Sequence, residues 1–463
     1  WLEEAQHRCA LRSAQAVLLN GEEAVDGRAA SVRIEARLEE ALGPCGVGAR
    51  LFAAVFLDGK ELARDVGEGP FAVQVAIPGP VRLWSPDSPV LYSALLALCE
   101  PDEAGCRDSV EFTFGLRWLS LSSDADVGPK MERDMLLNGQ RFLQHGVLYQ
   151  AYWPESLIAP PGHAALADDV RRIKESGFNL VRVHAAVMPA LFYSLCDRIG
   201  LLVWQDFPAG DARALPLWDH ARASVEERQG VSGLELDEVE RTEESAVAFW
   251  TELQAMVAWL SAFACIVCWI PFNEAWGQFQ TMRVVHWLRD FGGGRWINAA
   301  SGWNDISDLY PGLDAGDIAD VHNYEGPPFG KLNGTFTAWP LPYSGRALAL
   351  GEYGGLGLSV DDHEWAPDSS WAYGVVPANS EEFGQALLAL AGRLATLLCE
   401  SRVSAVVYTQ WNDIETEVNG LVTYDRVPKL SKAVLQEFSE IVTRAHKRCR
   451  PSPDGLRGPG AAP

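Results

Sequence analysis

The sequence predicts a (β/α)8 TIM barrel preceded by a small β-sandwich, and three observations support this fold class. The chain has 463 residues, which is more than one ordinary domain needs. Up to about residue 120, short β-type runs alternate with turns rich in Gly, Pro and Asp. From about residue 138, apolar strands alternate with helical segments, which is the order expected of a parallel barrel.

In the N-terminal part, the runs over residues 31–38, 50–57 and 71–77 have the composition of β-strands. Asp58-Gly59 between two such runs is typical of a hairpin turn. The length of this part and the regular spacing of its runs predict a small sandwich.

In the C-terminal part, the pattern predicts strands over residues 142–150, 180–184, 201–205, 266–270, 296–300, 318–322, 348–352 and 404–411. Helices are predicted over residues 163–176, 189–199, 246–263, 282–291, 381–398 and 432–446. A doubly wound sheet is the alternative, but no Gly-rich phosphate loop supports it. The expected domains are a sandwich over residues 1–120, a barrel over 121–450 and a disordered Pro/Gly-rich tail over 451–463.

The charged residues in the composition limit the classes of binding partner that are expected. Lys plus Arg number 38 and Asp plus Glu number 62, so the formal net charge is −24. This charge argues against nucleic acid and against an anionic membrane surface, and it suits an enzyme with a neutral substrate. No run in the sequence is expected to cross a membrane.

The nine cysteines do not suggest a disulfide framework. Cys265 and Cys268 have metal-like spacing, but they lie in an apolar strand pattern without a second pair, so we predict that they are core residues. Cys99 and Cys106 flank a short turn and are predicted to bridge if the compartment is oxidising.

Two carboxylates point to the chemistry. The apolar run that ends near Ile270 leads into Asn273-Glu274, and a second apolar run leads into Glu352. Two carboxylates at the carboxyl ends of barrel strands are what a retaining glycosidase needs. We assign Glu274 as acid/base and Glu352 as nucleophile, with Asn273 on the sugar 2-hydroxyl. Arg182, at the end of the second barrel strand, is expected to keep Glu352 ionised and to lower its pKa.

Other polar and aromatic residues also follow predicted strands. Each alone is as easily a satisfied buried group, but their shared position at one barrel face predicts a polar substrate pocket. These residues are His184, Asp206, Trp303, His322, Tyr324, Gln410 and Trp411. His184 and His322 lack the spacing of a metal site, so no metal ligand is predicted.

At these motifs the chain resembles glycoside hydrolase family 2, which contains β-galactosidases, β-glucuronidases and β-mannosidases. The resemblance rests on Asn273-Glu274, on the Gly-Glu-Tyr-Gly-Gly segment at 351–355, and on the segments 83–92, 114–117, 137–142 and 408–411. It implies that the sandwich is immunoglobulin-like and that Trp411 floors the sugar pocket. The segment 417–426 resembles a β-galactosidase-like subgroup. Larger β-galactosidases bind magnesium and sodium near the site. No ligands for these ions are assigned here, so no cofactor is expected and a site-associated ion is left open.

The leading hypothesis is therefore a retaining exo-β-glycosidase, most similar to β-galactosidases, that acts on a carbohydrate substrate by double displacement. The alternative is a carbohydrate-binding pseudoenzyme or scaffold on the same barrel. The sugar, the linkage, the oligomeric state and the compartment stay open at this stage.

Overall fold

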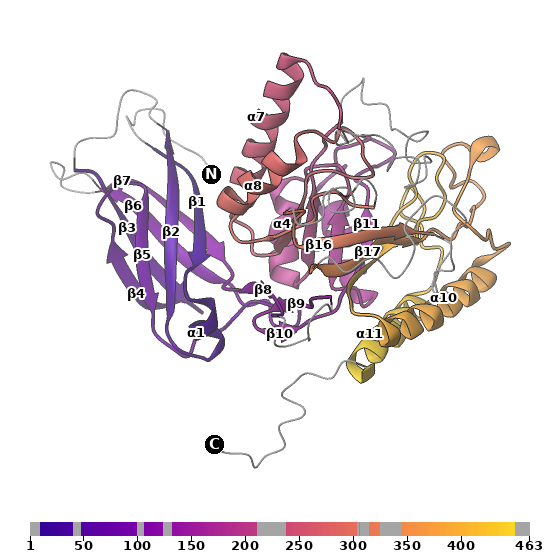
Figure 1. Ribbon diagram of the computed structural model, residues 1–463, viewed down its shortest axis with the longest axis horizontal. Helices are drawn as coiled ribbons and strands as arrows, with labels where there is room; N and C mark the ends of the chain where they lie inside the picture. The colour runs from indigo at the N-terminus through magenta and orange to yellow at the C-terminus, as the bar shows by residue number, and fades with distance from the viewer. Residues whose placement is uncertain are drawn as a thin grey trace, which may run out of the picture.

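The structure is a computed structural model, and it describes residues 10–39, 48–99, 106–123, 132–210, 238–302, 305, 314–324 and 345–449. A β-rich N-terminal part lies beside a larger part in which strands and helices alternate (Figure 1).

The N-terminal part consists of two antiparallel sheets. One has the strand order β1-β2-β5 and the other β4-β3-β6-β7. The elements are β1 (Ala10–Leu18), α1 (Gly21–Val25), β2 (Ala30–Glu39), β3 (Arg50–Leu57), β4 (Lys60–Val66), β5 (Ala72–Ile77), β6 (Tyr92–Cys99) and β7 (Cys106–Phe114). In β5, Val73, Val75 and Ile77 are buried while the residues between them are more exposed. This period of two turns one face of the strand toward a shared core, as in a sandwich.

A small three-stranded sheet leads from the sandwich into the barrel. It contains β8 (Leu119–Leu121), β9 (Met135–Leu137) and β10 (Gln140–Arg141), in the order β10-β9-β8.

The larger part is an eight-stranded parallel sheet curled into a nearly closed barrel, with the order β15-β14-β13-β12-β11-β18-β17-β16. Its strands are β11 (Gln144–Tyr149), β12 (Leu180–Val183), β13 (Leu202–Asp206), β14 (Ile266–Ile270), β15 (Trp296–Ile297), β16 (Ile318–Asn323), β17 (Ala347–Gly354) and β18 (Val403–Thr409). The helices are α3 (His163–Glu175), α4 (Ala190–Ile199), α7 (Glu243–Leu260), α8 (Thr281–Phe291), α10 (Ser380–Glu400) and α11 (Lys432–Cys449), with one 3-10 turn, η1 (Pro367–Ser369). The TIM-barrel prediction is confirmed, and the exact domain boundaries stay predictions.

The barrel strands are buried on both faces, which explains their continuous apolar sequences. In β14, all five residues from Ile266 to Ile270 are buried. Cys265 and Cys268 are free, buried thiols, so the prediction that they are core residues is confirmed. The fifth predicted strand is shorter than expected, because β15 contains only Trp296 and Ile297.

The sandwich is attached to the barrel by buried polar contacts. Arg117, just after β7, donates to the carbonyl oxygens of Ala264 and Ile266 at the start of β14. The indole N–H of Trp84 donates to the carbonyl oxygen of Asp197 at 2.8 Å. The sandwich therefore contacts the beginning of the strand that leads to Glu274.

Disulfides are more extensive than the sequence suggested. The predicted bridge between Cys99 and Cys106 is present, where it joins the ends of β6 and β7. A second bridge, Cys399–Cys449, links the C-terminal end of α10 to that of α11. Fifty residues separate these two cysteines, so sequence spacing gave no sign of the pairing.

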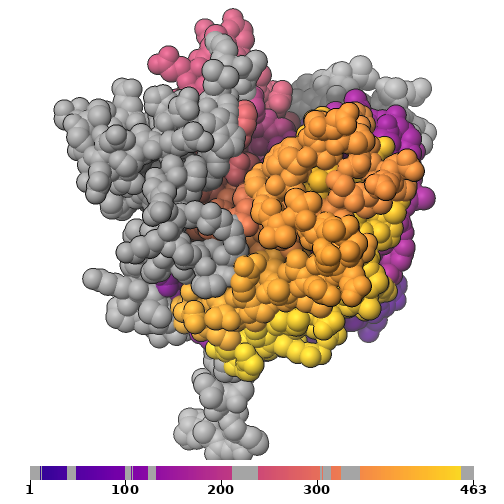
Figure 2. All heavy atoms as spheres, turned by 90° about the vertical axis from the view of Figure 1, so that its right-hand side faces the viewer, coloured from indigo at the N-terminus to yellow at the C-terminus, as the bar shows by residue number. Residues whose placement is uncertain are grey.

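Helix α10 is long and apolar enough to cross a membrane by length and composition, contrary to the sequence expectation. In the structure, 44% of its most apolar window is buried. Phe383, Leu387, Leu394 and Leu398 lie in the barrel's hydrophobic cluster, so this helix has the burial of a core-packing helix. Figure 2 shows the C-terminal part of the chain, in orange and yellow, forming a broad area of one face of the molecule.

Candidate active site

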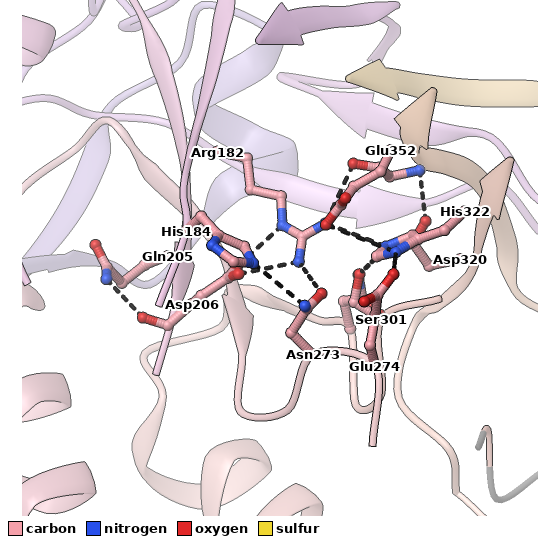
Figure 3. A network of polar contacts seen from close by, with 12 residues as sticks. Arg182, His184, Gln205, Asp206, Asn273, Glu274, Ser301, Asp320, His322 and Glu352 are labelled. Carbon is pink, nitrogen blue, oxygen red and sulfur yellow. Dashed lines mark hydrogen bonds and ion pairs between the residues drawn. The ribbon is translucent and has the colours of Figure 1, made fainter. Parts of the chain in front are cut away.

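Residues from the ends of several barrel strands meet in one polar network (Figure 3). Arg182 lies on β12, Asp206 ends β13, and Asn273-Glu274 follows β14. His322 lies on β16 and Glu352 on β17. Parallel strands place their carboxyl ends at the same rim of a barrel, so residues far apart in sequence come together there.

Arg182 is the centre of this network and is fully buried. Its Nε and Nη2 donate to the two carboxylate oxygens of Asp206 at 3.1 and 2.9 Å. Its Nη1 donates to Glu352 Oε1 at 3.1 Å and to the carbonyl oxygen of Gly351 at 3.2 Å. Nη2 also donates to Asn273 Oδ1 at 2.6 Å. One guanidinium thus orients two carboxylates and an amide, which belong to or follow three other strands.

Glu274 and Glu352 face each other across His322. Oxygens of the two carboxylates and a ring nitrogen of His322 all lie within 4.8 Å of one another. His322 Nδ1 is 2.7 Å from Glu274 Oε1 and 3.6 Å from Glu352 Oε1. The Glu352 side chain is 5% exposed and that of Glu274 is 15% exposed, so Glu274 is the more accessible of the two.

His322 is held from its other side by Ser301 and Asp320. Its Nε2 lies 2.8 Å from Ser301 Oγ, and Ser301 donates to Asp320 Oδ2 at 2.6 Å. Burial lowers the pKa of His322, but the charges of Glu352, Glu274 and Asp320 outweigh burial and raise this pKa above its ordinary value. When Nδ1 of His322 carries a proton, it donates to Glu274 Oε1.

The pKa of Glu352 differs from the sequence expectation. Burial raises it above its ordinary value, and the neighbouring charge of Glu274 acts in the same direction. His322 and Arg182 oppose this rise, as does the hydrogen bond from Tyr324. Arg182 therefore lowers the pKa of Glu352 as predicted, but burial outweighs this effect and the net shift is upward. The sequence did not reveal how deeply Glu352 is buried.

We expect Arg182→Met to move the acidic limb of the pH profile of kcat/KM upward. The predicted role of Glu352 as nucleophile requires an ionised carboxylate, and removing a cation 3.1 Å away raises the pKa of Glu352. A shift of about one pH unit corresponds to about 1.4 kcal/mol of lost differential stabilisation. Profiles of both proteins measured on one chromogenic substrate would test this. An unmoved limb in a folded variant would mean that Arg182 has no electrostatic effect on Glu352.

His184 follows β12 and is linked to the network through Asn273. The Asn273 Nδ2 lies 3.2 Å from His184 Nε2. Burial lowers the pKa of His184 to about 3, and the charges of Arg182 and His322 add to this effect. A neutral His184 accepts from Asn273, which fixes the amide with its oxygen toward Arg182.

Tyr324 and the backbone at Glu274 complete the arrangement. The Tyr324 hydroxyl donates to Glu352 Oε2, so both oxygens of this carboxylate are hydrogen-bonded. Glu274 has a φ of 48°, a left-handed conformation that costs a non-glycine residue roughly 1–2 kcal/mol. Strain of this kind is common where function fixes the direction of a side chain.

Two residues predicted for the pocket, Trp411 and Gln410, make their side-chain hydrogen bonds outside the Arg182 network. The indole N–H of Trp411 donates to Asp169 of α3, and the ring lies under Arg172 of the same helix. Both of these side-chain contacts are with α3. That Trp411 floors the sugar pocket stays a prediction. Gln410 is buried and donates from Nε2 to Asn419 Oδ1 at 2.8 Å. Trp303 lies outside the described residues.

Sequence reasoning missed four residues near the site, which are Ser301, Asp320, Tyr373 and Glu417. Strand alternation could have found Asp320, because it lies two residues before His322 on β16 and so faces the same side. The other three lie in loops, where no periodic signal exists.

Glu274, His322 and Glu352 are also the described groups that could together hold a metal ion. Arg182 and Tyr324 already occupy the oxygens of Glu352, however, and His322 Nδ1 is engaged by Glu274. A metal ion bound by these three residues would have to displace the hydrogen bonds that they make.

Comparisons with known proteins agree with the family resemblance of the motifs. No protein-family model matches the chain. The chain is 30% identical over 156 residues to a β-galactosidase of Psychromonas ingrahamii, which is 33% of this chain and 13% of that protein. It is 31% identical over 141 residues to a putative β-glucuronidase of Formosa agariphila, which is 30% of this chain and 12% of that protein. The chain thus spans only a small part of the curated relatives it matches.

Among solved structures, a β-glucuronidase of Parabacteroides merdae superposes with a TM-score of 0.67 at 15% identity. The superposition covers 93% of this chain and 52% of that one. At this identity the match establishes the shared fold. The resemblance to glycoside hydrolase family 2 is therefore confirmed, by sequence relatives named β-galactosidase and β-glucuronidase and by the fold of a β-glucuronidase.

Proposed function

We propose that this chain is a retaining exo-β-glycosidase, with Glu352 as nucleophile and Glu274 as acid/base. The separation of the two carboxylates is the observation that carries the proposal. One oxygen of Glu274 and one oxygen of Glu352 lie within 4.8 Å of each other. Retaining enzymes place their carboxyl groups about 5–5.5 Å apart, whereas inverting enzymes leave roughly 6.5–9.5 Å for a water molecule.

The roles follow from the surroundings of each group. Glu352 accepts hydrogen bonds on both oxygens and has a cation beside it, which suits a carboxylate that attacks the anomeric carbon. Glu274 is the more exposed and has only His322 as a described side-chain partner, so it is free to exchange a proton with a leaving group and then with water. Asn273 is held by Arg182 and His184 in a position suited to the 2-hydroxyl of the sugar.

A β-galactoside is the first candidate substrate, because relatives of this chain are named β-galactosidase and the segment 417–426 resembles that subgroup. A β-glucuronide is the second candidate, because another relative of this chain is named a putative β-glucuronidase. The non-catalytic alternative is disfavoured, since a barrel that only binds sugar does not need this hydrogen-bonded carboxylate pair.

The test is a panel of 4-nitrophenyl glycosides containing the β-galactoside, β-glucuronide, β-mannoside and α-L-arabinoside, with an α-galactoside as control. We expect one β-glycoside to dominate and its first-formed product, followed by NMR, to be the β anomer. Added EDTA is expected to leave the rate unchanged, since the mechanism assigns no metal. A first-formed α anomer would contradict retention, and a folded protein inactive on the whole panel would favour the pseudoenzyme.

A further inference from the structure

A stack of aromatic rings leads from the proposed nucleophile to the surface. Tyr324, whose hydroxyl donates to Glu352, lies flat against Tyr373 with ring centroids 3.6 Å apart and an interplanar angle of 5°. Trp371 meets Tyr373 edge-on at 5.0 Å. We call Tyr324, Tyr373 and Trp371 the aromatic ladder. Its outer member, Trp371, is 44% exposed, so an apolar ring is presented to solvent near the catalytic carboxylates.

The ladder is held in place by the chain around it. Trp371 N donates to the carbonyl oxygen of Thr416 at 2.8 Å, and Val418 N donates to the carbonyl oxygen of Trp371 at 2.9 Å. Gly355 has a φ of +63°, and a Cβ there would come within 2.7 Å of Tyr373 and 3.1 Å of Tyr324. The last glycine of the 351–355 motif therefore leaves the space in which the two tyrosines stack.

A carboxylate lies beside the ladder. Glu417 forms a backbone bridge with Trp371, and its Oε1 accepts from Asn419 Nδ2 at 2.7 Å. Asn419 is fixed in turn by Gln410. Among the residues that the structure describes, no hydrogen bond is made to Glu417 Oε2. One oxygen of an oriented, half-buried carboxylate is therefore free to accept a hydrogen bond from a ligand.

We propose that Trp371, Tyr373 and Glu417 form a subsite for the leaving group, and that this group is a neutral sugar. The proposal rests on the proposed function, since it extends the same site. The apolar C–H face of a sugar packs on aromatic rings, and its hydroxyl groups donate to carboxylates. In an exo-acting enzyme the glycon occupies the buried end, so the exposed end of the ladder faces the leaving group.

The negative charges around Glu417 favour a neutral sugar over an acidic one as the leaving group. Burial raises the pKa of Glu417 to about 7, the hydrogen bond from Asn419 opposes this rise, and the charges of Glu352, Asp413 and Glu274 add to it. A leaving group with its own carboxylate would bring a further negative charge to this cluster, which costs free energy.

The first experiment compares lactose with β-galactosyl fluoride, whose leaving group is too small to reach Trp371. We expect Trp371→Ala to lower the ratio of kcat/KM for lactose to that for the fluoride by about tenfold. Trp365→Ala is the matched control, because Trp365 is 47% exposed in the same segment but packs on Tyr424. Its ratio should stay within twofold of the wild type. An unchanged ratio for Trp371→Ala would overturn the subsite.

A second measurement does not depend on turnover. Lactose and galactose are titrated by calorimetry into Glu352→Gln, with and without Trp371→Ala. We expect Trp371→Ala to weaken the binding of lactose about tenfold and the binding of galactose less than twofold. Equal weakening of both sugars would place the ladder on the glycon side and overturn the assignment. Wild-type protein that hydrolyses no panel substrate, while lactose still binds through Trp371, would refute the proposed function and leave the subsite standing.

Discussion

Replacing Glu352 by Gln is expected to lower kcat/KM for the preferred chromogenic glycoside by about 10⁴-fold or more. The amide cannot form the glycosyl–enzyme bond, and no other carboxylate oxygen among the described residues occupies the same position against Arg182 and Tyr324. Steady-state rates with the 4-nitrophenyl substrate would measure the loss, and mass spectrometry with a slow 2-fluoro glycoside would show label on the wild type only.

The fold should survive this change. Arg182 retains its paired contact with Asp206, so its charge is not left without a partner. Glu437→Gln on the exposed face of α11 is a matched control with the same chemical change. A Glu352→Gln protein that keeps more than a tenth of the wild-type rate, with a normal unfolding temperature, would rule out Glu352 as the nucleophile.

Replacing Glu274 by Ala is expected to slow hydrolysis by about 10²–10⁴-fold for a glycoside with a poor leaving group. The rate of the first chemical step should fall far less for a 2,4-dinitrophenyl glycoside, whose leaving group needs no proton. Added azide should restore turnover and give a β-glycosyl azide, because a small anion can enter the space left by the carboxylate. Product NMR and rates with and without azide would measure both effects.

The configuration of the azide decides between the two roles. Rescue of Glu274→Ala with a β product fits an acid/base. If azide instead rescues the Glu352 variant and gives the α product, the two assignments are reversed. The change also removes the carboxylate that pairs with His322 Nδ1, so the variant's unfolding temperature should be compared with that of the wild type.

Sequence reasoning was strongest where a side chain ends a buried strand. Glu274, Glu352, Arg182 and Asp206 follow or end apolar runs, and the barrel geometry then requires their side chains to share one rim. Neighbouring strands in the sheet order are also mostly consecutive in sequence, which is why a simple strand–helix alternation predicted the topology.

It was weaker where position depends on loops or on the direction of a side chain. Tyr373 and Glu417 lie in connections whose path no period reveals, and only contacts with Tyr324 and Asn419 place them near the site. For Trp411, the place after β18 was predictable from the sequence. Whether its ring faces the barrel axis or α3 depends on the local backbone conformation, which residue spacing alone does not determine.

The attachment of Arg117 to the start of β14 has a consequence for how the molecule denatures. Without the sandwich, the carbonyl oxygen of Ala264 would lose the guanidinium of Arg117, and that of Ile266 would keep only the hydrogen bond from Arg295, so the strand that leads to Glu274 would be loosened at its first residues. Melting of the N-terminal sheets should therefore be cooperative with loss of the barrel rim that carries Glu274 and Glu352, so that heat inactivation and the loss of β-sheet signal follow one transition.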